Sequence, residues 1–265
     1  MSSRSEIADF IATAHELADL AGAAILPHFR RRIRVDNKAS GGGFDPVTAA
    51  DRAAERAISK ALASRLPDHG LEGEEYGHRN PEARMRWIVD PIDGTRAFIL
   101  GMPLWGTLIG LVDDGVPVIG MMDQPYTRER FWSGKSTSHF RGPDSKEGRI
   151  RTRSCESLAD AMLTTTDPEL FTSTRDRRGF KAVRERARAV RYGGDCYAYC
   201  LLAAGFVDIV VETGLKPHDI VALIPIIERA GGQVTTWDGG PAAAGGRILA
   251  TGDARVHKEA LTLLA

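Results

Sequence analysis

The sequence is best approached from one stretch in its first half, which reads Trp87-Ile88-Val89-Asp90-Pro91-Ile92-Asp93-Gly94-Thr95. Its apolar start predicts a buried strand that ends at Asp90, and Pro91 then predicts a turn. Residues three apart on a regular strand point to opposite faces, so this turn must fold Asp90 and Asp93 toward one point. Two carboxylates at one point repel each other unless a cation lies between them, and hard oxygen ligands favour Mg²⁺ or a similar ion. Gly94 and Thr95 add backbone N–H groups and a hydroxyl, which suit a phosphate oxygen.

Three further acidic segments accompany this stretch. Glu72, Glu74 and Glu75 lie in one short loop, Asp45-Pro-Val-Thr-Ala-Ala-Asp51 precedes an apolar helical pattern, and Asp219 precedes another. Each segment has an ordinary explanation by itself, as a solvated acidic loop, a helix cap with a first-turn acid, or a second cap. It is their order and spacing together that indicate a site.

Composition limits the classes of protein that the chain can represent. Its 265 residues fit one domain made of two tightly joined halves, with a soft boundary near residues 140–155. Lysine and arginine together number 35, as do aspartate and glutamate, and this balance argues against a dedicated nucleic-acid binder. The apolar residues near the N-terminus are interrupted by charges, and no window approaches the ~20 apolar residues of a membrane span.

The cysteines indicate the compartment. Cys155, Cys196 and Cys200 form an odd set without paired spacing, which predicts free thiols in a reducing environment. Cys196 and Cys200 can share a helix face, but no second Cys/His pair lies nearby to complete a zinc site. We therefore expect a cytoplasmic protein without a membrane segment.

The elements follow from hydrophobic periodicity and turn residues. We expect a helix over 5–33 that Pro27 bends or ends, and a helix over 46–66 capped by Asp45 with Pro46 as its first residue. The glycine-rich segment 38–44 predicts either a flap over a site or a flexible connector. Further helices are expected at 175–187, 197–204 and 220–230, and strands at 86–90, 108–112, 116–121, 161–165, 207–212, 233–237 and 248–251.

Together these segments resemble the inositol monophosphatase-like superfamily of lithium-sensitive, magnesium-dependent phosphatases. The shared signatures cover nearly the whole chain and lie at 45–51, 73–75, 87–95 and 218–219. Within the superfamily the chain is most similar to bacterial histidinol-phosphate phosphatases, through the stretches 103–110, 122–126, 191–199 and 215–225. One residue departs from the inositol monophosphatase pattern, because His218 stands where those enzymes usually carry tryptophan.

The resemblance implies a layered α/β fold, an alternating α-β-α-β-α sandwich, in a protein that forms homodimers. It places metal ions between the two halves of the chain. One Mg²⁺ would be held by Glu74, Asp90 and the Ile92 carbonyl, and a second by Asp90, Asp93 and Asp219. A third, weaker ion would use Glu74 with waters, and Mn²⁺ could substitute for Mg²⁺.

The resemblance also implies a reaction, the hydrolysis of a small phosphate monoester by direct attack of a water that the metals activate. Asp45 and Thr95 would orient and help deprotonate this water, while the Gly94 and Thr95 amides would hold the phosphate. Asp195 and Glu212, the latter at the superfamily's substrate-contacting position, would bind the rest of the substrate. A carboxylate there would favour the ammonium group of histidinol phosphate, although carboxylates also bind sugar hydroxyls. Trp105 and Tyr197 could flank an imidazole or simply belong to the core.

Three alternatives stay open at this point. A covalent phosphatase of the haloacid dehalogenase type would need the spacing Asp-x-Asp, whereas the chain has Asp-x-x-Asp. The same fold could act on inositol phosphate, fructose bisphosphate or a nucleotide bisphosphate. A non-catalytic metal- or phosphate-binding regulator would be expected to lose Thr95 or Asp45, and both are present.

Overall fold

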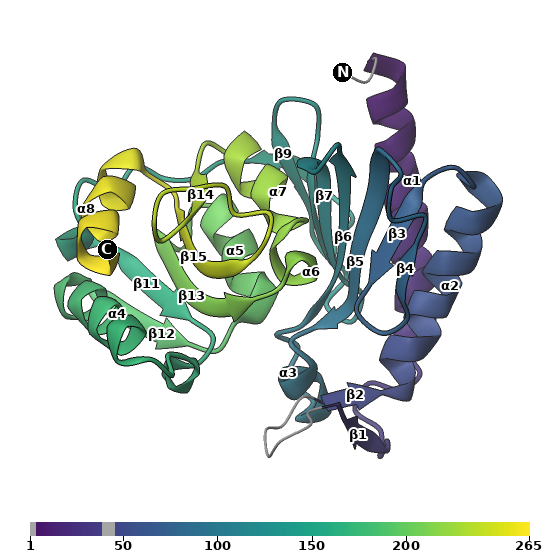
Figure 1. Cartoon of the computed structure of the whole chain (residues 1–265), viewed down its shortest axis with the longest axis horizontal. Coiled ribbons are helices and arrows are strands. Elements are labelled where there is room, and N and C mark those ends of the chain that lie inside the picture. The colour runs from purple at the N-terminus through teal and green to yellow at the C-terminus, as the bar shows by residue number, and fades with distance from the viewer. Residues whose placement is uncertain (1–3, 39–45) are drawn as a thin grey trace.

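The computed structural model describes residues 4–38 and 46–265. The chain forms five layers, with helices outside and between two twisted sheets (Figure 1). This arrangement is the α-β-α-β-α sandwich that the resemblance implied, and it confirms the α/β fold class.

The first half of the chain builds a sheet of eight strands in the order β10-β9-β8-β7-β6-β5-β3-β4. All its pairings are antiparallel except the pairing of β3 with β5, which is parallel. Its strands are β3 (Gly70–Gly73), β4 (Gly77–Arg79), β5 (Met85–Asp93), β6 (Gly106–Asp113), β7 (Val116–Gln124), β8 (Glu129–Ser133), β9 (Ser138–Arg141) and β10 (Glu147–Ile150).

Two long helices, α1 (Arg4–Ile25) and α2 (Ala49–Arg65), cover the outer face of this sheet. Their apolar faces pack with residues of β5, β6 and β7 in one core, in which Ala14, Leu17, Ile58 and Trp87 are fully or almost fully buried. A short ribbon of β1 (Val35–Asn37) and β2 (Pro46–Thr48) lies between the two helices in the sequence.

The second half builds a sheet of five strands in the order β12-β11-β13-β15-β14. Its strands are β11 (Met162–Thr165), β12 (Ala189–Tyr192), β13 (Ile209–Leu215), β14 (Gln233–Thr236) and β15 (Gly246–Thr251). Helices α4 (Thr174–Arg186) and α8 (Ala254–Leu264) cover its outer face, and the short 3₁₀ segments Leu158–Asp160 and Pro168–Leu170 flank β11.

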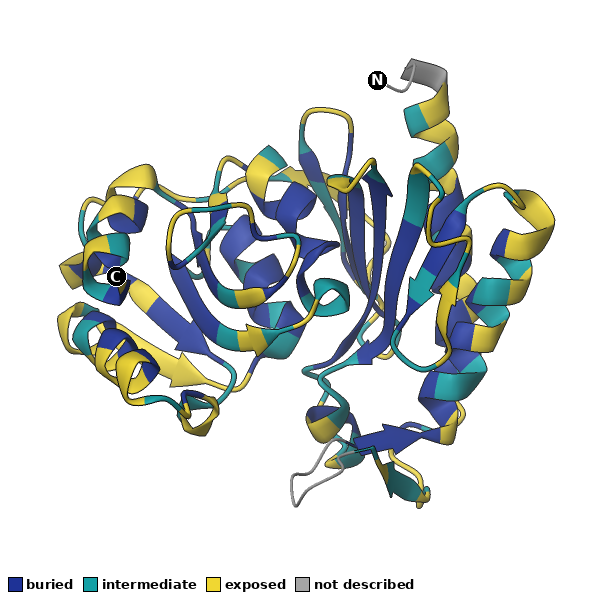
Figure 2. Cartoon of the chain, in the orientation of Figure 1, coloured by how far each residue is buried: buried dark blue, intermediate teal, exposed yellow. Residues whose placement is uncertain are grey.

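The middle layer consists of α5 (Asp195–Ala203), α6 (Pro217–Ile220) and α7 (Leu223–Arg229). Their apolar side chains form a second core with Leu108 and Met122 of the large sheet and Val210 and Ile248 of the small sheet. Figure 2 shows this middle layer as mostly buried, whereas α4 and β12 at the outer edge of the small sheet are largely exposed. The two sheets are thus joined by a continuous apolar contact, and the chain passes from one to the other between Ile150 and Met162.

Several predicted boundaries were wrong for local reasons. The first helix ends at Ile25 rather than 33, which confirms the expectation that Pro27 ends it and excludes a bent continuation. The second helix begins at Ala49 rather than Pro46, because residues 46–48 pair with β1. Its cap is Thr48, in a capping box with Asp51, whereas the prediction was Asp45. The helix expected over 220–230 begins only at Leu223, as α7, and a separate short helix, α6, ends at Ile220. Pro225 lies in the first turn of α7, where a missing N–H costs little.

The hairpin predicted at 113–115 is confirmed. Asp114 and Gly115 both have positive φ, at 51° and 81°, as the tight turn between β6 and β7 requires. The glycine-rich segment 38–44, predicted as either a flap or a flexible connector, falls almost wholly in 39–45, outside the described residues.

Candidate active site

A bulge in β5 brings the two aspartates of the central stretch together. Asp90 pairs with Leu108 and Asp93 pairs with Gly106, so three steps along β5 oppose two steps along β6. The extra residue reverses the alternation of side chains, and Asp90 and Asp93 therefore fall on the same side of the sheet. The predicted strand end at Asp90 was wrong, because pairing continues to Asp93, but the predicted meeting of the two carboxylates is confirmed.

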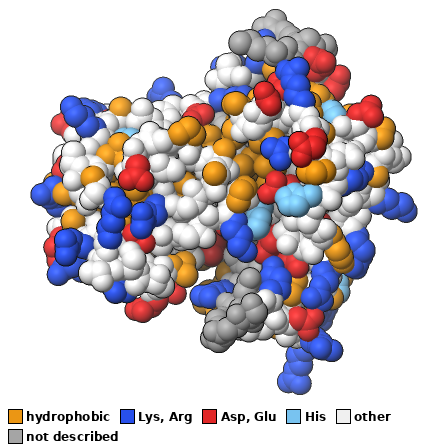
Figure 3. Space-filling view, viewed as in Figure 1, with side chains coloured by type: hydrophobic (Ala, Val, Ile, Leu, Met, Phe, Trp, Pro, Cys, Tyr) orange, Lys and Arg blue, Asp and Glu red, His pale blue; other side chains and the backbone are white. Residues whose placement is uncertain are grey.

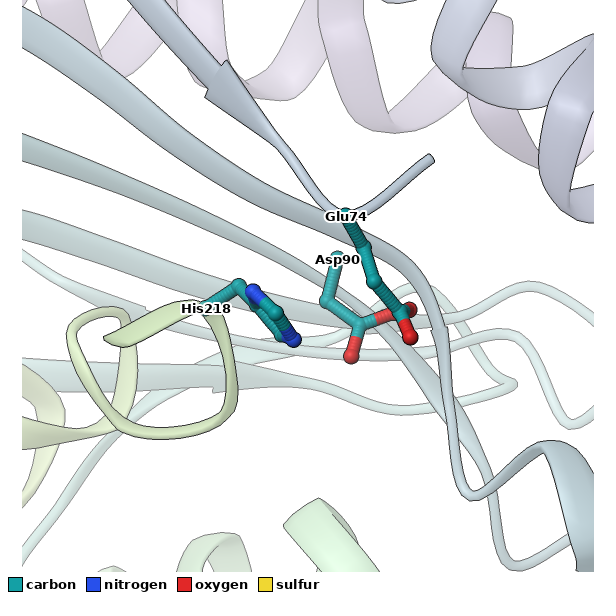
Figure 4. A group of neighbouring side chains, drawn as sticks. All are labelled: Glu74, Asp90 and His218. Atoms are coloured by element: carbon teal, nitrogen blue, oxygen red, sulfur yellow. The ribbon is translucent and has the colours of Figure 1, made fainter. Parts of the chain in front are cut away.

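The carboxylates converge with residues from distant parts of the chain. Ligand atoms of Asp90, Asp93 and Asp219 all lie within 4.8 Å of one another, and so do those of Glu74, Asp90 and His218. Figure 4 shows the Glu74 and Asp90 carboxylates side by side, with the His218 ring directed toward Asp90. Asp90 belongs to both groups and thus joins them into one cluster.

Burial and mutual repulsion make this cluster unstable as a set of bare anions. The pKa of Asp90 lies well above its usual value because of burial and the nearby Glu74, Asp93 and Asp219 charges. The pKa of Asp93 is raised in the same way, by burial and by Asp195 and Asp219, although the backbone N–H of Cys196 donates a 2.9 Å hydrogen bond to its Oδ1. A dense group of carboxylate oxygens that cannot ionise together is the donor set that a hard divalent cation fits.

Lys38 supplies a positive charge at the edge of the cluster. Its ammonium lies 2.6 Å from Glu74 Oε1 and 2.7 Å from Glu75 Oε1. Burial opposes the charged form, but the hydrogen bonds to Glu74 and Glu75 prevail and raise the pKa of Lys38. Glu74 therefore belongs to the cluster, and Glu75 is joined to it through Lys38, whereas Glu72 lies in β3 near His78 and Arg86.

The Gly94-Thr95 pair closes the bulge and begins α3 (Thr95–Ile99). Gly94 has a φ of +85°, and a Cβ at this position would lie 2.8 Å from the Leu104 carbonyl oxygen, so only glycine fits without displacement. The Thr95 hydroxyl donates a 2.9 Å hydrogen bond to the Ile92 carbonyl. Its lone pairs stay available to accept a hydrogen bond from another group.

These residues line one cleft of about 420 Å³ between the two sheets. On the face shown in Figure 3, acidic and histidine side chains gather where the two halves meet. All the predicted site residues that the structure describes line the cleft: Glu74, Asp90, Ile92, Asp93, Gly94, Thr95, Asp195, Glu212 and Asp219.

Asp195 and Glu212 lie in the wall of the cleft that the second half contributes. Burial raises the pKa of Glu212 to about 8, even though Thr166 N–H donates a 2.6 Å hydrogen bond to its Oε1. Burial also raises the pKa of Asp195 to about 6, opposed by Arg96 and aided by Asp219. Asp195 has a φ of +44°, an uncommon conformation for a non-glycine residue.

Asp219 both caps a helix and belongs to the carboxylate cluster, the two roles that the sequence suggested. Its Oδ2 accepts a 2.6 Å hydrogen bond from the Lys216 N–H and so caps α6, as the ordinary explanation predicted. It also belongs to the carboxylate cluster, with Oδ1 3.6 Å from His218 Nε2. Burial raises the pKa of Asp219, while His218 opposes this shift.

Some predicted residues lie elsewhere. Asp45 falls outside the described residues. Trp105 is fully buried in the N-terminal core against Phe29 and Phe98, and the Tyr197 hydroxyl donates to Glu129 rather than reaching the cleft. Neither ring lines the cleft, so neither flanks a substrate imidazole there.

Sequence reasoning missed three residues of interest. His218 was noted only as a departure from a family pattern, although it neighbours Glu74 and Asp90. Asp51 was expected only as an acid in the first turn of a helix, and its Oδ2 does accept hydrogen bonds from Thr48. Its buried Oδ1, however, has no hydrogen-bond partner among the described residues. The negative charge of Asp51 also helps to raise the pKa of Asp90. The buried Tyr199 hydroxyl, in a side chain that lines the cleft, likewise has no partner there. No local sequence signal distinguishes Tyr199 from a core residue.

The sequence model of one protein family, described as the inositol monophosphatase family, matches residues 6–265. The chain belongs to the inositol monophosphatase family. It is accordingly a phosphatase of a metal-dependent family, and its acidic cluster is a group of residues that could hold the metal.

Curated relatives of this inositol monophosphatase-family protein have more than one activity in their names. A chloroplastic bifunctional phosphatase IMPL2 of Arabidopsis thaliana is 41% identical over 99% of this chain and 77% of its own length. A histidinol-phosphatase of Mycobacterium tuberculosis is 35% identical over 88% of both chains. A histidinol-phosphatase of Streptomyces coelicolor is 32% identical over 97% of both chains.

Solved structures share the whole fold. An inositol monophosphatase from Zymomonas mobilis is 42% identical, with a TM-score of 0.86 over 100% of this chain and 99% of that one. The extragenic suppressor protein suhB from Bartonella henselae is 27% identical, with a TM-score of 0.85 over 97% and 98%. Within residues 4–38 and 46–265, no helix of this family member is long and apolar enough to cross a bilayer.

Proposed function

We propose that this phosphatase hydrolyses L-histidinol phosphate to L-histidinol and phosphate, a step of histidine biosynthesis, with Mg²⁺ as its metal. The observation that carries the proposal is the single cleft in which the carboxylate cluster at the β5 bulge faces a second acidic wall, Asp195 and Glu212. The cluster suits the phosphate end of a substrate through a cation, and the wall suits a cationic end.

The metal ligands in this proposal are Glu74, Asp90, the Ile92 carbonyl, Asp93 and Asp219. Two of the three Mg²⁺ positions considered share Asp90, which agrees with its place in both groups of ligand atoms. A divalent cation bound there would neutralise negative charge on the phosphoryl group and make a nearby water more acidic. Mn²⁺, which prefers the same oxygen ligands, would serve as a substitute.

The chain's own residues would position the reactants. The Gly94 and Thr95 amides would donate to phosphate oxygens, and the Thr95 hydroxyl, anchored to the Ile92 carbonyl, would accept a hydrogen bond from the attacking water. Asp45 and Thr95 would together orient this water and help to remove its proton. The unpartnered Oδ1 of Asp51 makes that carboxylate an alternative acceptor.

The substrate's other end would be recognised by charge. Burial leaves Glu212 protonated near neutral pH in the free protein, and an ammonium group placed beside it would favour the carboxylate form. A neutral polyol offers no such charge compensation for Glu212 and the partly buried Asp195. The similarity to several histidinol-phosphatases supports this choice.

Inositol 1-phosphate is the second candidate. It is favoured by the similarity to the Zymomonas mobilis inositol monophosphatase, and carboxylates such as Glu212 also bind hydroxyl groups. We further propose that the protein works in the cytoplasm as a homodimer, with no nucleic-acid or membrane partner. Light scattering of the protein as it elutes from a size-exclusion column measures its mass and so tests the dimer.

The proposal is tested by phosphate release from L-histidinol phosphate with Mg²⁺, after chelation, and after Mg²⁺ is restored. We expect activity to disappear with chelator and return with Mg²⁺ or Mn²⁺. Full activity in metal-free buffer, or failure to hydrolyse histidinol phosphate while inositol 1-phosphate is cleaved, would contradict it.

A further inference from the structure

A second and larger cavity lies outside the candidate active site. It has a volume of about 890 Å³, which is within the range of small-molecule sites. Its walls come from β8, β9, α5, the loop after α5 and residues 149–154, where the chain leaves the large sheet. Among the residues that the structure describes, none lines both this cavity and the cleft of the candidate active site.

The floor of this cavity is aromatic. The rings of Phe131 and Phe140 are 4.6 Å apart between centroids, and Tyr197 meets Phe131 edge-on at 6.1 Å. Phe206, on the loop after α5, is 68% exposed, which is unusual for so large an apolar side chain. A flat apolar group would bury these surfaces and make ring contacts with them.

The rim of the cavity is positively charged. Arg149, Arg151 and Arg153 all line it, and Arg153 is paired with Asp208. For the guanidinium groups of Arg149 and Arg151, the structure records no ion pair or hydrogen bond with any residue in 4–38 or 46–265. The acid of the cavity, Glu129, already accepts a 2.7 Å hydrogen bond from the Tyr197 hydroxyl. The guanidinium groups of Arg149 and Arg151 together exceed the single negative charge of Glu129, so the rim keeps a net positive charge that suits a carboxylate, sulfonate or phosphate.

One helix separates this cavity from the catalytic cleft. Tyr197, Leu201 and Ala204, on or just after α5, line the cavity, whereas Asp195 and Cys196 at the start of α5 line the cleft. The Cys196 N–H is the group that donates to Asp93. A ligand that packs against α5 on one side thus contacts the same helix that holds a cluster carboxylate on the other.

We propose that this second cavity is an effector site for a small amphipathic anion, one flat apolar group carrying a carboxylate, sulfonate or phosphate, and that its occupancy stabilises α5. The binding part of this inference is independent of the proposed substrate. Only an effect on catalysis would rest on the proposed function, so both tests below measure the protein without turnover.

The first test is a fluorescence titration with 8-anilinonaphthalene-1-sulfonate, with the uncharged N-phenyl-1-naphthylamine as its matched probe. We expect one saturable site for the sulfonate, with an affinity at least tenfold above that of the neutral probe. Arg151→Glu and Arg149→Glu should each weaken sulfonate binding at least tenfold and leave the neutral probe unchanged, because only the anion uses the guanidinium groups. Ala204→Trp should weaken both probes by filling the cavity.

The charge-matched control is Arg178→Glu on the exposed face of α4, which changes the net charge equally without touching the cavity. Since Arg149 and Arg151 are exposed, their substitution should not affect folding, and the result does not depend on the larger Ala204→Trp change. Sulfonate affinity equal to wild type in both arginine variants, or an equal loss in Arg178→Glu, would overturn the proposed site.

The second test is amide hydrogen exchange of residues 195–203 with and without saturating sulfonate probe. We expect exchange in α5 to slow at least several-fold in wild type and not in Arg151→Glu. Saturable binding with unchanged exchange in α5 would overturn the proposed link to the cleft.

Discussion

At the scale of single residues, Asp93 and Thr95 separate metal binding from water positioning. Asp93→Asn removes a charge from the cluster and keeps its shape, so metal affinity should fall and added Mg²⁺ should restore part of the activity. Thr95→Ala keeps every carboxylate but loses the hydroxyl held by the Ile92 carbonyl. We expect kcat to fall by about 10²-fold or more, the usual scale for a lost positioning group, without rescue by Mg²⁺.

The measurement for this pair is kcat as a function of Mg²⁺ concentration in both variants. If Thr95 were only a turn residue, Thr95→Ala would lower stability slightly and leave turnover nearly intact. That outcome would remove Thr95 from the mechanism and leave Asp45 and Asp51 as the candidates to accept the proton.

Glu212 gives a prediction on pH. Burial raises the pKa of its carboxyl to about 8 in the folded chain, while the unfolded chain titrates near the ordinary value of 4.5. The folded state therefore binds a proton more tightly, and the stability contributed by this group is present below pH 4.5 and lost as the pH rises toward 8. Glu212→Gln, which keeps a neutral group there, should gain stability relative to wild type as the pH rises.

This comparison uses urea unfolding of wild type and Glu212→Gln in chelator at pH 5 and pH 8.5. A difference in unfolding free energy that is the same at both pH values would show that Glu212 does not hold a raised pKa.

The acidic residues of the site could be predicted because their chemistry is local. Asp90-Pro-Ile-Asp-Gly-Thr95 places two acids and a phosphate-binding turn within six residues, and a family resemblance connects them to Glu74 and Asp219. His218 and Tyr199 were not predicted as site residues, because what matters for them is which groups the fold places opposite, and one sequence does not show this.

At the scale of elements, the turn after β5 depends on Gly94. An alanine there would be strained by the positive φ of +85°, and its Cβ would also lie too close to the Leu104 carbonyl oxygen. Gly115→Ala is the matched control, because Gly115 has a φ of +81° but open space around its Cβ position. We expect Gly115→Ala to cost roughly 1 kcal/mol from the backbone alone, and Gly94→Ala to cost clearly more and to lower kcat as well.

Thermal unfolding and initial rates of the two glycine variants provide the check. Equal losses of stability, with full activity in Gly94→Ala, would mean that the bulge tolerates a side chain and that its geometry is not needed for the site.

Helices and strands with a clear hydrophobic periodicity were predicted well. Boundaries that depend on pairing between strands were predicted poorly. The apolar face of α2 is evident in the sequence, but its start at Ala49 depends on the pairing of residues 46–48 with β1. The β5 bulge depends in the same way on the register with β6. Strands β8, β9 and β10 were missed, because their sequences are too short or too polar to show an alternating pattern.

At the scale of the whole molecule, the carboxylate cluster joins the two halves, since Asp90 and Asp93 come from the first sheet and Asp219 from the middle layer. Their raised pKa values mean that the metal-free protein loses stability as the pH rises and these groups are forced to ionise. A cation that binds only the folded state should restore about 2.7 kcal/mol at 100 times its Kd.

We therefore expect Mg²⁺ to raise the midpoint of thermal unfolding, more at pH 8 than at pH 5.5, with a smaller rise in Asp93→Asn. Calorimetry with and without chelator measures this directly. A midpoint that does not respond to Mg²⁺ at pH 8 would argue against a metal site between the halves.

The central claim, a histidinol-phosphate phosphatase, is tested most directly by competition. L-histidinol phosphate and inositol 1-phosphate are mixed at equal concentration with Mg²⁺, and their early consumption is followed by phosphorus NMR, so that the ratio of rates equals the ratio of kcat/KM. Because the buried Glu212 and the partly buried Asp195 face the cleft as acids, we predict that histidinol phosphate is consumed at least tenfold faster. Equal or faster consumption of inositol 1-phosphate would contradict the claim.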